Sequence, residues 1–213
     1  MRIVAIGAHL DDIELACGGT LALAIQRGHE VLMVIAAGGP DLGYDNAILR
    51  TSEQSALEAE AAAKVLGVEQ LIRLDFPVKD VPYSSETVES FDKITKKFKP
   101  DLIFGHWPFD THQDHQRTAL ASISASRYFN SILMFEPITP AGRSYIGFRP
   151  QMYVDITSTI DIKIKALKTH RSQYERYGER WLEAVRARAN HRGFEMGVQY
   201  AEAYEIMRFE MKL

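Results

Sequence analysis

The chain has 213 residues, of which 46% are hydrophobic and 25% are charged, and this composition excludes a wholly disordered protein. A net charge of −3 argues against a nucleic-acid partner, and a single cysteine, Cys17, excludes an internal disulfide and is typical of the cytoplasm. The longest apolar run, residues 31–37, is shorter than the roughly 20 residues that span a bilayer, so we expect a cytoplasmic protein with no membrane partner.

Short apolar runs alternate with helical patterns over the first three quarters of the chain. Strands are expected at residues 3–7, 31–37, 71–76, 102–105, 132–135 and 152–156. Helices are expected at residues 18–28, 51–66, 85–99 and 113–126. Strands separated by helices in this way predict βαβ units with right-handed crossovers. The expected fold class is therefore α/β, a Rossmann-like, mostly parallel sheet flanked by helices.

The last quarter of the chain has a different pattern. From residue 158 it becomes helical and charged, and a short closing strand is expected at residues 204–209. The sequence contains no internal repeat and no linker. We therefore expect residues 1–213 to form a single domain, with a core of about 1–157 and a C-terminal helical and strand appendage of about 158–213.

Two groups of polar residues follow the first and fourth expected strands, where parallel α/β sheets bind their ligands. Residues 7–14 contain His9 and two adjacent aspartates, and residues 106–115 contain three histidines. Adjacent carboxylates repel each other unless a cation compensates their charge. Two imidazoles and one carboxylate suit zinc with one position left open for water, although iron and other divalent ions accept the same donors. This pattern predicts a catalytic metal site.

The polar residues beside the ligands suit hydrolysis of an amide or ester. Asp11 lies next to the expected ligands and is a natural general base for the attacking water. If His112 is not itself a ligand, it suits donation to a developing oxyanion, and Asp114 suits orientation of that imidazole. The sequence does not decide whether His106 lies beside the ligands, in the core or at the surface.

The two motifs resemble those of the PIG-L/LmbE-type zinc-dependent de-N-acetylases. The first family motif, A-H-P-D-D-x-E, corresponds to residues 8–14, with Leu10 in place of the usual proline. The second, H-x-D-H, corresponds to residues 112–115. Proline would fix the backbone of the first motif, so its replacement bears on how rigidly the ligands are held. The paired motifs imply a Rossmann-like fold without a dinucleotide site.

The resemblance also implies a role for each site residue. The metal ion, Zn²⁺ or alternatively Fe²⁺ or another divalent ion, would be bound by His9, Asp12 and His115. The catalytic residues would be the base Asp11, the oxyanion donor His112 and its orienting partner Asp114. Arg50 and Tyr200 would line the substrate pocket. Trp107 lies beside the second motif, and two roles for it are left open: stacking on a sugar and packing in the core.

The implied activity is that of an amide hydrolase which removes the N-acetyl group from an amino-sugar conjugate, such as an N-acetylglucosamine derivative. The partner would be this small molecule, and because family members often form trimers or hexamers, a homo-oligomer is expected. One alternative is a non-catalytic metal-binding protein of the same fold. A second is a phosphoacceptor receiver-like domain with Asp75 as its phosphorylated residue. That domain needs a lysine after the fifth strand, where residues 135–137 read Phe-Glu-Pro.

Overall fold

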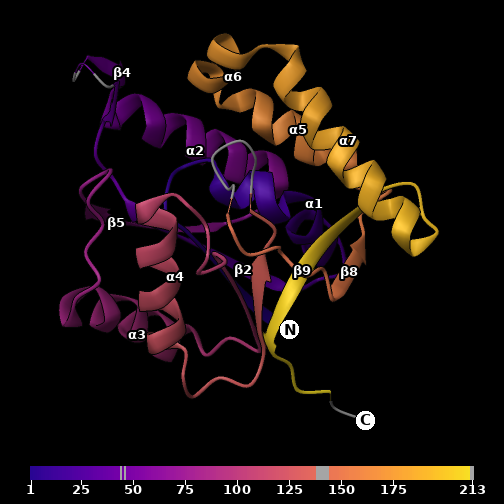
Figure 1. The fold of residues 1–213 in the computed structure, drawn as a ribbon, viewed down its shortest axis with the longest axis horizontal. Coiled ribbons are helices and arrows are strands. Elements are labelled where there is room, and N and C mark those ends of the chain that lie inside the picture. The colour runs from indigo at the N-terminus through magenta and orange to yellow at the C-terminus, as the bar shows by residue number, and fades with distance from the viewer. Residues whose placement is uncertain (44, 46, 138–143, 212–213) are drawn as a thin grey trace.

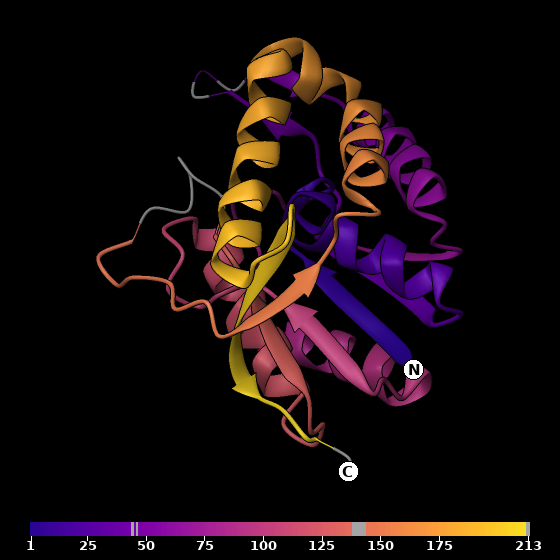
Figure 2. The ribbon, with the colours of Figure 1, turned by 90° about the vertical axis from the view of Figure 1, so that its right-hand side faces the viewer.

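A seven-stranded sheet with helices on both faces forms the centre of the molecule (Figures 1 and 2). The structure is a computed structural model that describes residues 1–43, 45, 47–137 and 144–211. The strand order is β5-β2-β1-β6-β7-β9-β8. This arrangement confirms the expected single α/β fold with a mostly parallel sheet.

The strands lie close to their expected positions. The parallel strands are β1 (Arg2–Gly7), β2 (Glu30–Ala37), β5 (Gln70–Phe76), β6 (Leu102–Gly105) and β7 (Ile132–Phe135). Strand β9 (Ala201–Arg208) pairs antiparallel with β7 on one side and with β8 (Met152–Asp155) on the other. A separate hairpin, β3 (Asp41–Leu42) and β4 (Ile48–Arg50), interrupts the segment after β2, where the sequence suggested only a loop.

The helices form two layers around the sheet. Helices α3 (Ser85–Phe98) and α4 (Gln113–Ala125) cover one face, where they contact each other and the central strands. Helices α1 (Asp12–Gln26), α2 (Ser52–Leu66) and α5 (Ile160–Thr169) cover the other. Helices α6 (Arg171–Tyr177) and α7 (Glu179–Met196) continue from α5, and α7 reaches β8 and β9 (Figure 2).

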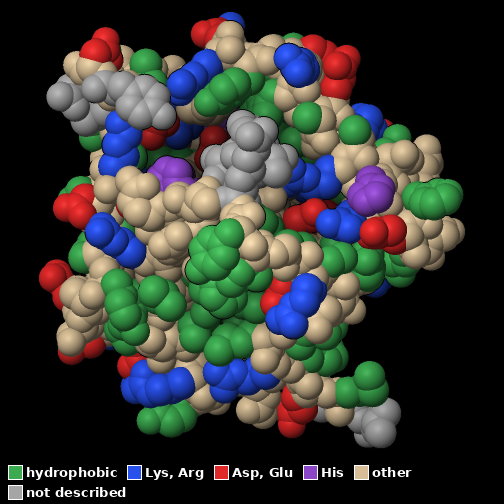
Figure 3. Space-filling model, in the orientation of Figure 1, with side chains coloured by type: hydrophobic (Ala, Val, Ile, Leu, Met, Phe, Trp, Pro, Cys, Tyr) green, Lys and Arg blue, Asp and Glu red, His purple; other side chains and the backbone are tan. Residues whose placement is uncertain are grey.

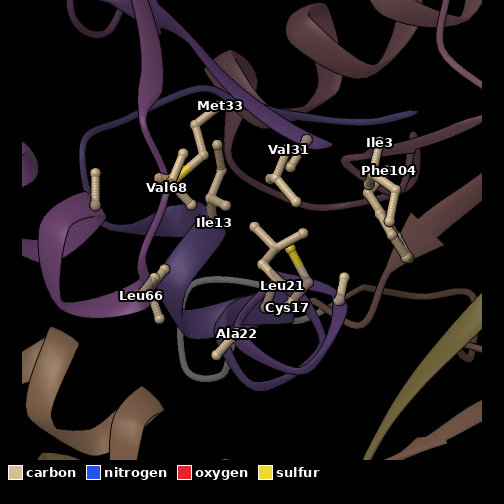
Figure 4. Packing of buried hydrophobic residues seen from close by; sticks show 14 of the residues in the cluster. Ile3, Ile13, Cys17, Leu21, Ala22, Val31, Met33, Leu66, Val68 and Phe104 are labelled. Atoms are coloured by element: carbon tan, nitrogen blue, oxygen red, sulfur yellow. The ribbon is translucent and has the colours of Figure 1, made fainter. Parts of the chain in front are cut away.

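The sequence pattern explains why the sheet is buried on both faces. Along β1, Ile3 and Ala5 belong to the apolar cluster under α1 and α2, whereas Val4 and Ile6 belong to the cluster under α3 and α4. This follows from the alternation of side chains along a strand. Figure 4 shows the first cluster, in which residues of α1 such as Leu21 pack toward the strands.

Helix α1 begins at Asp12, not at Gly18 as the sequence suggested. The two glycines lie inside the helix, just after Cys17, whose φ of −136° and ψ of 15° interrupt the helical backbone. A Cβ atom on Gly19 would lie 2.8 Å from the side chain of Ile156. Gly19 therefore marks a close approach of α1 to Ile156 and not the first turn of the helix, which is opened by the metal motif itself.

The C-terminal quarter is tied to the rest of the chain by hydrogen bonds as well as by the sheet. The side chain of Glu202 in β9 accepts from the backbone N–H groups of Gly19 and Thr20, at 3.0 and 2.8 Å. Lys163 Nζ lies 2.5 Å from this carboxylate and 2.7 Å from the carbonyl oxygen of Leu15. The division into a core of about 1–157 and an appendage of about 158–213 stays a prediction. No helix in the described ranges has both the length and the apolarity to cross a bilayer.

Candidate metal centre and active site

The two motifs meet at the carboxyl ends of β1 and β6, which are neighbours in the sheet. The chain runs from β1 outward through β2 to β5 and then returns to β6 on the other side of β1, so the strand order reverses here. Such a reversal leaves a crevice in which α/β proteins bind ligands. Figure 3 shows histidine and acidic side chains in a hollow between α2 and the upper end of α4.

Three side chains converge at the centre of this crevice. Nδ1 of His9 lies 3.4 Å from Oδ2 of Asp12 and 3.3 Å from Nε2 of His115. The same Nε2 of His115 lies 3.4 Å from Oδ1 of Asp12. One donor atom from each residue falls within 4.8 Å of the other two. Two imidazole nitrogens and one carboxylate oxygen at this spacing suit a divalent ion such as zinc, so the donor set fits the predicted metal.

The second nitrogen of each imidazole is held by a further carboxylate. Nε2 of His9 lies 2.9 Å from Oδ2 of Asp114, and Nδ1 of His115 lies 2.8 Å from Oδ2 of Asp110. Carboxylates in this position are typical of metal-binding histidines, because they fix the tautomer and orient the ring toward the ion. This pairing independently supports a metal site at His9 and His115.

Other combinations of these residues also bring donor atoms together. One is His9, His112 and Asp114, and another is His106, Asp110 and His115. Both use a carboxylate whose two oxygens already have partners, whereas the backbone N–H groups that Asp12 accepts, from Ala8 and His9, both donate to Oδ2 and leave Oδ1 for an ion. Asp114 accepts from the backbone N–H groups of Lys79 and Val81 at 2.6 and 3.1 Å, in addition to its contact with His9. The set with Asp12 is therefore the best candidate.

Asp114 does not occupy the position expected of it. We expected its carboxylate to orient His112, but that carboxylate lies against His9. Instead, the backbone N–H of Asp114 donates to Nδ1 of His112 at 3.2 Å. Because Nδ1 accepts a hydrogen bond, a neutral imidazole carries its proton on Nε2. His112 therefore retains the N–H donor that its predicted role needs, through a backbone contact in place of a carboxylate.

Two residues near the ligands have roles that the sequence did not define. Asp110 accepts from the backbone N–H of His112 at 2.9 Å, next to its contact with His115. Its position two residues before the N-cap of α4 is typical of an Asx turn, and this is the signal that points to it. His106 stacks on His115, with 4.2 Å between ring centroids, and its Nε2 lies 3.1 Å from Asp12.

The carboxylates and imidazoles of the site shift one another's pKa values. Burial lowers the pKa of His9, but its hydrogen bonds with Asp114 and Asp12 outweigh burial and raise it to about 10. Burial also lowers the pKa of His115, but contacts with aspartates raise it to about 9. Burial and the two neighbouring imidazoles lower the pKa of His112 to about 4. Protonated imidazoles thus balance the carboxylates, and a bound cation would replace those protons.

Asp11 differs from the other carboxylates of the site. No hydrogen bond of its side chain to any residue that the structure describes is found, although it lies beside Asp12. Burial and the charge of Asp12 raise the pKa of Asp11, whereas the charges of Arg50 and His170 oppose this change. Its carboxylate is therefore available for a reacting group.

Arg50 lies buried behind Asp11, with a side chain that is 2% exposed. Its guanidinium contacts Asp41 at 2.8 Å and Glu58 at 3.5 Å. The hydroxyl of Ser172 donates to Glu58 at 2.6 Å, which joins α6 to this network. The expected contact of Arg50 with substrate stays a prediction, and the contacts found here are ion pairs within the protein.

The other two predicted substrate residues lie in different surroundings. Trp107 is 2% exposed and packs edge-on against Phe109 and Phe148. Tyr200 precedes β9, and its ring lies 5.8 Å from the guanidinium of Arg186. None of its contacts in the described part of the chain reaches the metal-binding side chains. Their roles in substrate binding stay predictions.

The glutamate that ends the first motif is completely buried. Glu14 and His170 are both 0% exposed, with 3.4 Å between Oε1 and Nε2. Contact with this carboxylate raises the pKa of His170 although burial opposes it. The pair therefore links the first turn of α1 to the junction of α5 and α6, behind Asp11.

Comparison with known proteins gives a consistent result. The sequence model of the family described as PIG-L, GlcNAc-PI de-N-acetylase, matches residues 4–126. The chain is 26% identical to the diacetylchitobiose deacetylase of Thermococcus kodakarensis over 97% of its length and 83% of the relative. It is 33% identical to the uncharacterized deacetylase YaiS of Escherichia coli over 80% of its length and 90% of the relative.

A solved structure agrees with these sequence relatives. The N,N'-diacetylchitobiose deacetylase from Pyrococcus horikoshii, in complex with an inhibitor, superposes with a TM-score of 0.81 at 27% identity. The match covers 97% of this chain and 84% of that chain. Similarity on this scale extends over the described strands and helices and not only over the two motifs.

Proposed function

This chain belongs to the PIG-L family of GlcNAc-PI de-N-acetylases, and we propose that it is a metal-dependent amide hydrolase that removes the N-acetyl group from an amino-sugar conjugate. Relatives named as deacetylases, one of them for an acetylated disaccharide, support the amide bond and the amino sugar. The family assignment leaves the phosphoacceptor alternative without support.

The main support for the proposal is that two imidazoles lie beside Asp12 and that each is oriented by a further carboxylate. His9, Asp12 and His115 would hold the ion, with Asp114 and Asp110 fixing the two rings. When bound, a zinc ion supplies Lewis acidity and lowers the pKa of a coordinated water. We propose Zn²⁺ as this ion, with Fe²⁺ or another divalent ion as the alternative.

The remaining residues have roles in the transfer of protons and the stabilisation of charge. Asp11 takes a proton from the attacking water on its carboxylate. The water oxygen forms a bond to the amide carbon, and the N–H at Nε2 of His112 donates to the oxygen that becomes negative. Asp11 then returns the proton to the nitrogen as the carbon–nitrogen bond breaks. The products are acetate and a free amine.

The proposal is tested by acetate release from a panel of N-acetylglucosamine conjugates together with metal analysis. We expect about one tightly held zinc or iron per chain, and no acetate release from Asp11→Asn although its metal stays bound. His115→Ala should lose both metal and activity. His112→Ala should keep the metal and lose on the order of 10²-fold or more in rate. A fully active Asp11→Asn variant would show that another group is the base.

A non-catalytic metal-binding protein is distinguished by the same panel. Such a protein would hold the ion with the same ligands but release acetate from none of the conjugates. We also propose a cytoplasmic homo-oligomer, a trimer or hexamer. Light scattering during gel filtration of the metal-loaded protein would test the assembly, and a monomer would refute it.

A further inference from the structure

Two residues other than glycine have a positive φ in the part of the chain that the structure describes. They are Lys79 at 67° and Lys99 at 53°, and this conformation costs free energy for any residue with a Cβ atom. Lys99 is the C-cap of α3, where a left-handed residue commonly ends a helix. Lys79 lies three residues after β5 and caps no helix. Residues held in such a conformation often lie at functional sites, where the surrounding structure fixes them.

The turn that contains Lys79 directs two backbone N–H groups at one carboxylate. The N–H of Asp80 donates to the carbonyl oxygen of Pro77 at 3.3 Å, which closes a four-residue turn with Lys79 as its third residue. Turns with a positive φ at this position usually have glycine or asparagine there. The N–H of Lys79 donates to Oδ2 of Asp114 at 2.6 Å, and the N–H of Val81 donates to Oδ1 at 3.1 Å. Each oxygen of this carboxylate therefore accepts one N–H from the segment of residues 77–81.

The carboxylate held by this segment is the one that orients a proposed metal ligand. Oδ2 of Asp114, which accepts the N–H of Lys79, also lies 2.9 Å from Nε2 of His9. The side chain of Asp114 is 0% exposed, so protein donors and not solvent set its orientation. The backbone at Lys79 thus fixes the position of Oδ2, and Oδ2 fixes the ring of His9.

The segment is fastened to the first two turns of α4. The side-chain amide of Gln113 donates to the carbonyl oxygen of Lys79 at 3.3 Å. Arg117 forms an ion pair with Asp80 at 2.8 Å and donates to the carbonyl oxygen of Val81 at 3.4 Å. These contacts join the turn to the helix that carries the second motif, and they provide the surrounding support that a left-handed lysine requires.

We propose that Lys79 is a positioning residue for the metal ligand His9, and that it acts through its left-handed backbone and not through its ammonium group. The ammonium group is at the surface, where Nζ donates to the carbonyl oxygen of Gly43 at 3.3 Å. The proposal rests on the metal site of the proposed function, but it does not depend on deacetylation.

Three substitutions separate the backbone of Lys79 from its side chain. A β-branched residue strongly disfavours a positive φ, so Lys79→Val should move the turn and withdraw its N–H from Asp114. Lys79→Gly removes the ammonium group but permits the same backbone. Lys99→Val is the matched control, because it places the same strain at the end of α3, before the start of β6 and so at the opposite edge of the sheet from the metal motifs. Competition with a chromophoric chelator measures the zinc dissociation constant of each variant.

We expect Lys79→Val to bind zinc about tenfold more weakly, the lower end of the usual effect of losing a partner that orients a ligand. Lys79→Gly should bind zinc as the wild type does. Lys99→Val should also do so, although it should unfold at a lower urea concentration. Unchanged affinity in Lys79→Val would overturn the proposal. Equal weakening in Lys79→Gly would overturn it by showing that the ammonium group matters, and equal weakening in Lys99→Val would show a general loss of stability.

The NMR signals of the ring nitrogens of His9 give a readout that needs no metal. They are identified by their absence from the spectrum of His9→Gln. In the metal-free protein Lys79→Val should shift these signals and Lys99→Val should not. If the wild type binds no zinc, the proposed function fails, whereas unshifted His9 signals in Lys79→Val would overturn only the role of the turn.

A second variant covers the case in which Lys79→Val does not fold. Arg117→Ala removes an exposed ion pair that contributes little to stability, and it frees the other end of the turn from α4. It should shift the His9 signals in the same direction as a displaced turn would. His9 signals identical to those of the wild type in Arg117→Ala would then overturn the proposal.

Discussion

Replacement of Asp110 by asparagine tests how the second motif holds the metal ligand His115. In the structure one carboxylate oxygen lies 2.8 Å from Nδ1 of His115, and the other accepts the backbone N–H of His112 at 2.9 Å. An asparagine has only one acceptor oxygen. At one of these two contacts its NH₂ group would therefore face another N–H donor, and the hydrogen bond would be lost. The charge that favours a basic imidazole is also lost.

We expect the Asp110→Asn protein to bind zinc 10–100-fold more weakly, which is the usual effect of removing such a carboxylate. This corresponds to about 1.4–2.8 kcal/mol of binding free energy. The magnitude is limited because the three proposed ligands all remain. Competition with a chromophoric chelator measures the dissociation constant directly, and circular dichroism checks that the variant is folded.

Asp161→Asn is the matched control, because Asp161 has a side chain that is 84% exposed and is paired with Arg186 on α7. Two outcomes would refute the reasoning. Zinc affinity within twofold of the wild type would show that Asp110 does not orient a ligand. Complete loss of binding by a folded variant would show that Asp110 is itself a ligand.

Two further predictions concern the stability of the fold and the reactivity of its only cysteine. Lys163→Met should lower the free energy of unfolding by about 3–5 kcal/mol, because it leaves the carboxylate of Glu202 buried without its cation. The control Lys93→Met removes the cation of an exposed pair and should change the free energy of unfolding by less than about 1 kcal/mol. Urea denaturation measures both, and equal effects would contradict the role of the buried pair. Burial raises the pKa of the Cys17 thiol well above its ordinary value, so the native protein should resist iodoacetamide at pH 8 and react after unfolding. Rapid labelling of the native protein, followed by mass spectrometry, would contradict this burial.

The sequence predicted the parts of this protein that depend on local patterns. Alternation of buried strands and amphipathic helices indicated the α/β fold, and the helix expected at residues 51–66 is α2, with Thr51 as its N-cap and Gly67 as its C-cap. The start of α1 was misjudged, because Gly18 and Gly19 resemble a helix boundary but lie inside the helix, where Gly19 packs closely against Ile156. Packing between distant segments leaves no periodic signal in a sequence.

The same distinction applies to the candidate site. Spacing within the motifs indicated that His9 and Asp12 face one side and that His112 and His115 do the same. The resemblance to the PIG-L/LmbE family then implied His9, Asp12 and His115 as the ligand set. The partners of these ligands were decided only by the fold. Asp110, in the loop before α4, contacts Nδ1 of His115, and Asp114, in the first turn of α4, contacts Nε2 of His9.

The sequence by itself thus determined the element types, the family and the donor atoms available for a metal, since each is encoded within a few neighbouring residues. Only the tertiary structure decided that Arg50 lies in ion pairs behind Asp11 and that β9 enters the sheet between β7 and β8. These features bring together separate elements of the chain, and their energies arise from burial and charge pairing that exist only after the chain has folded.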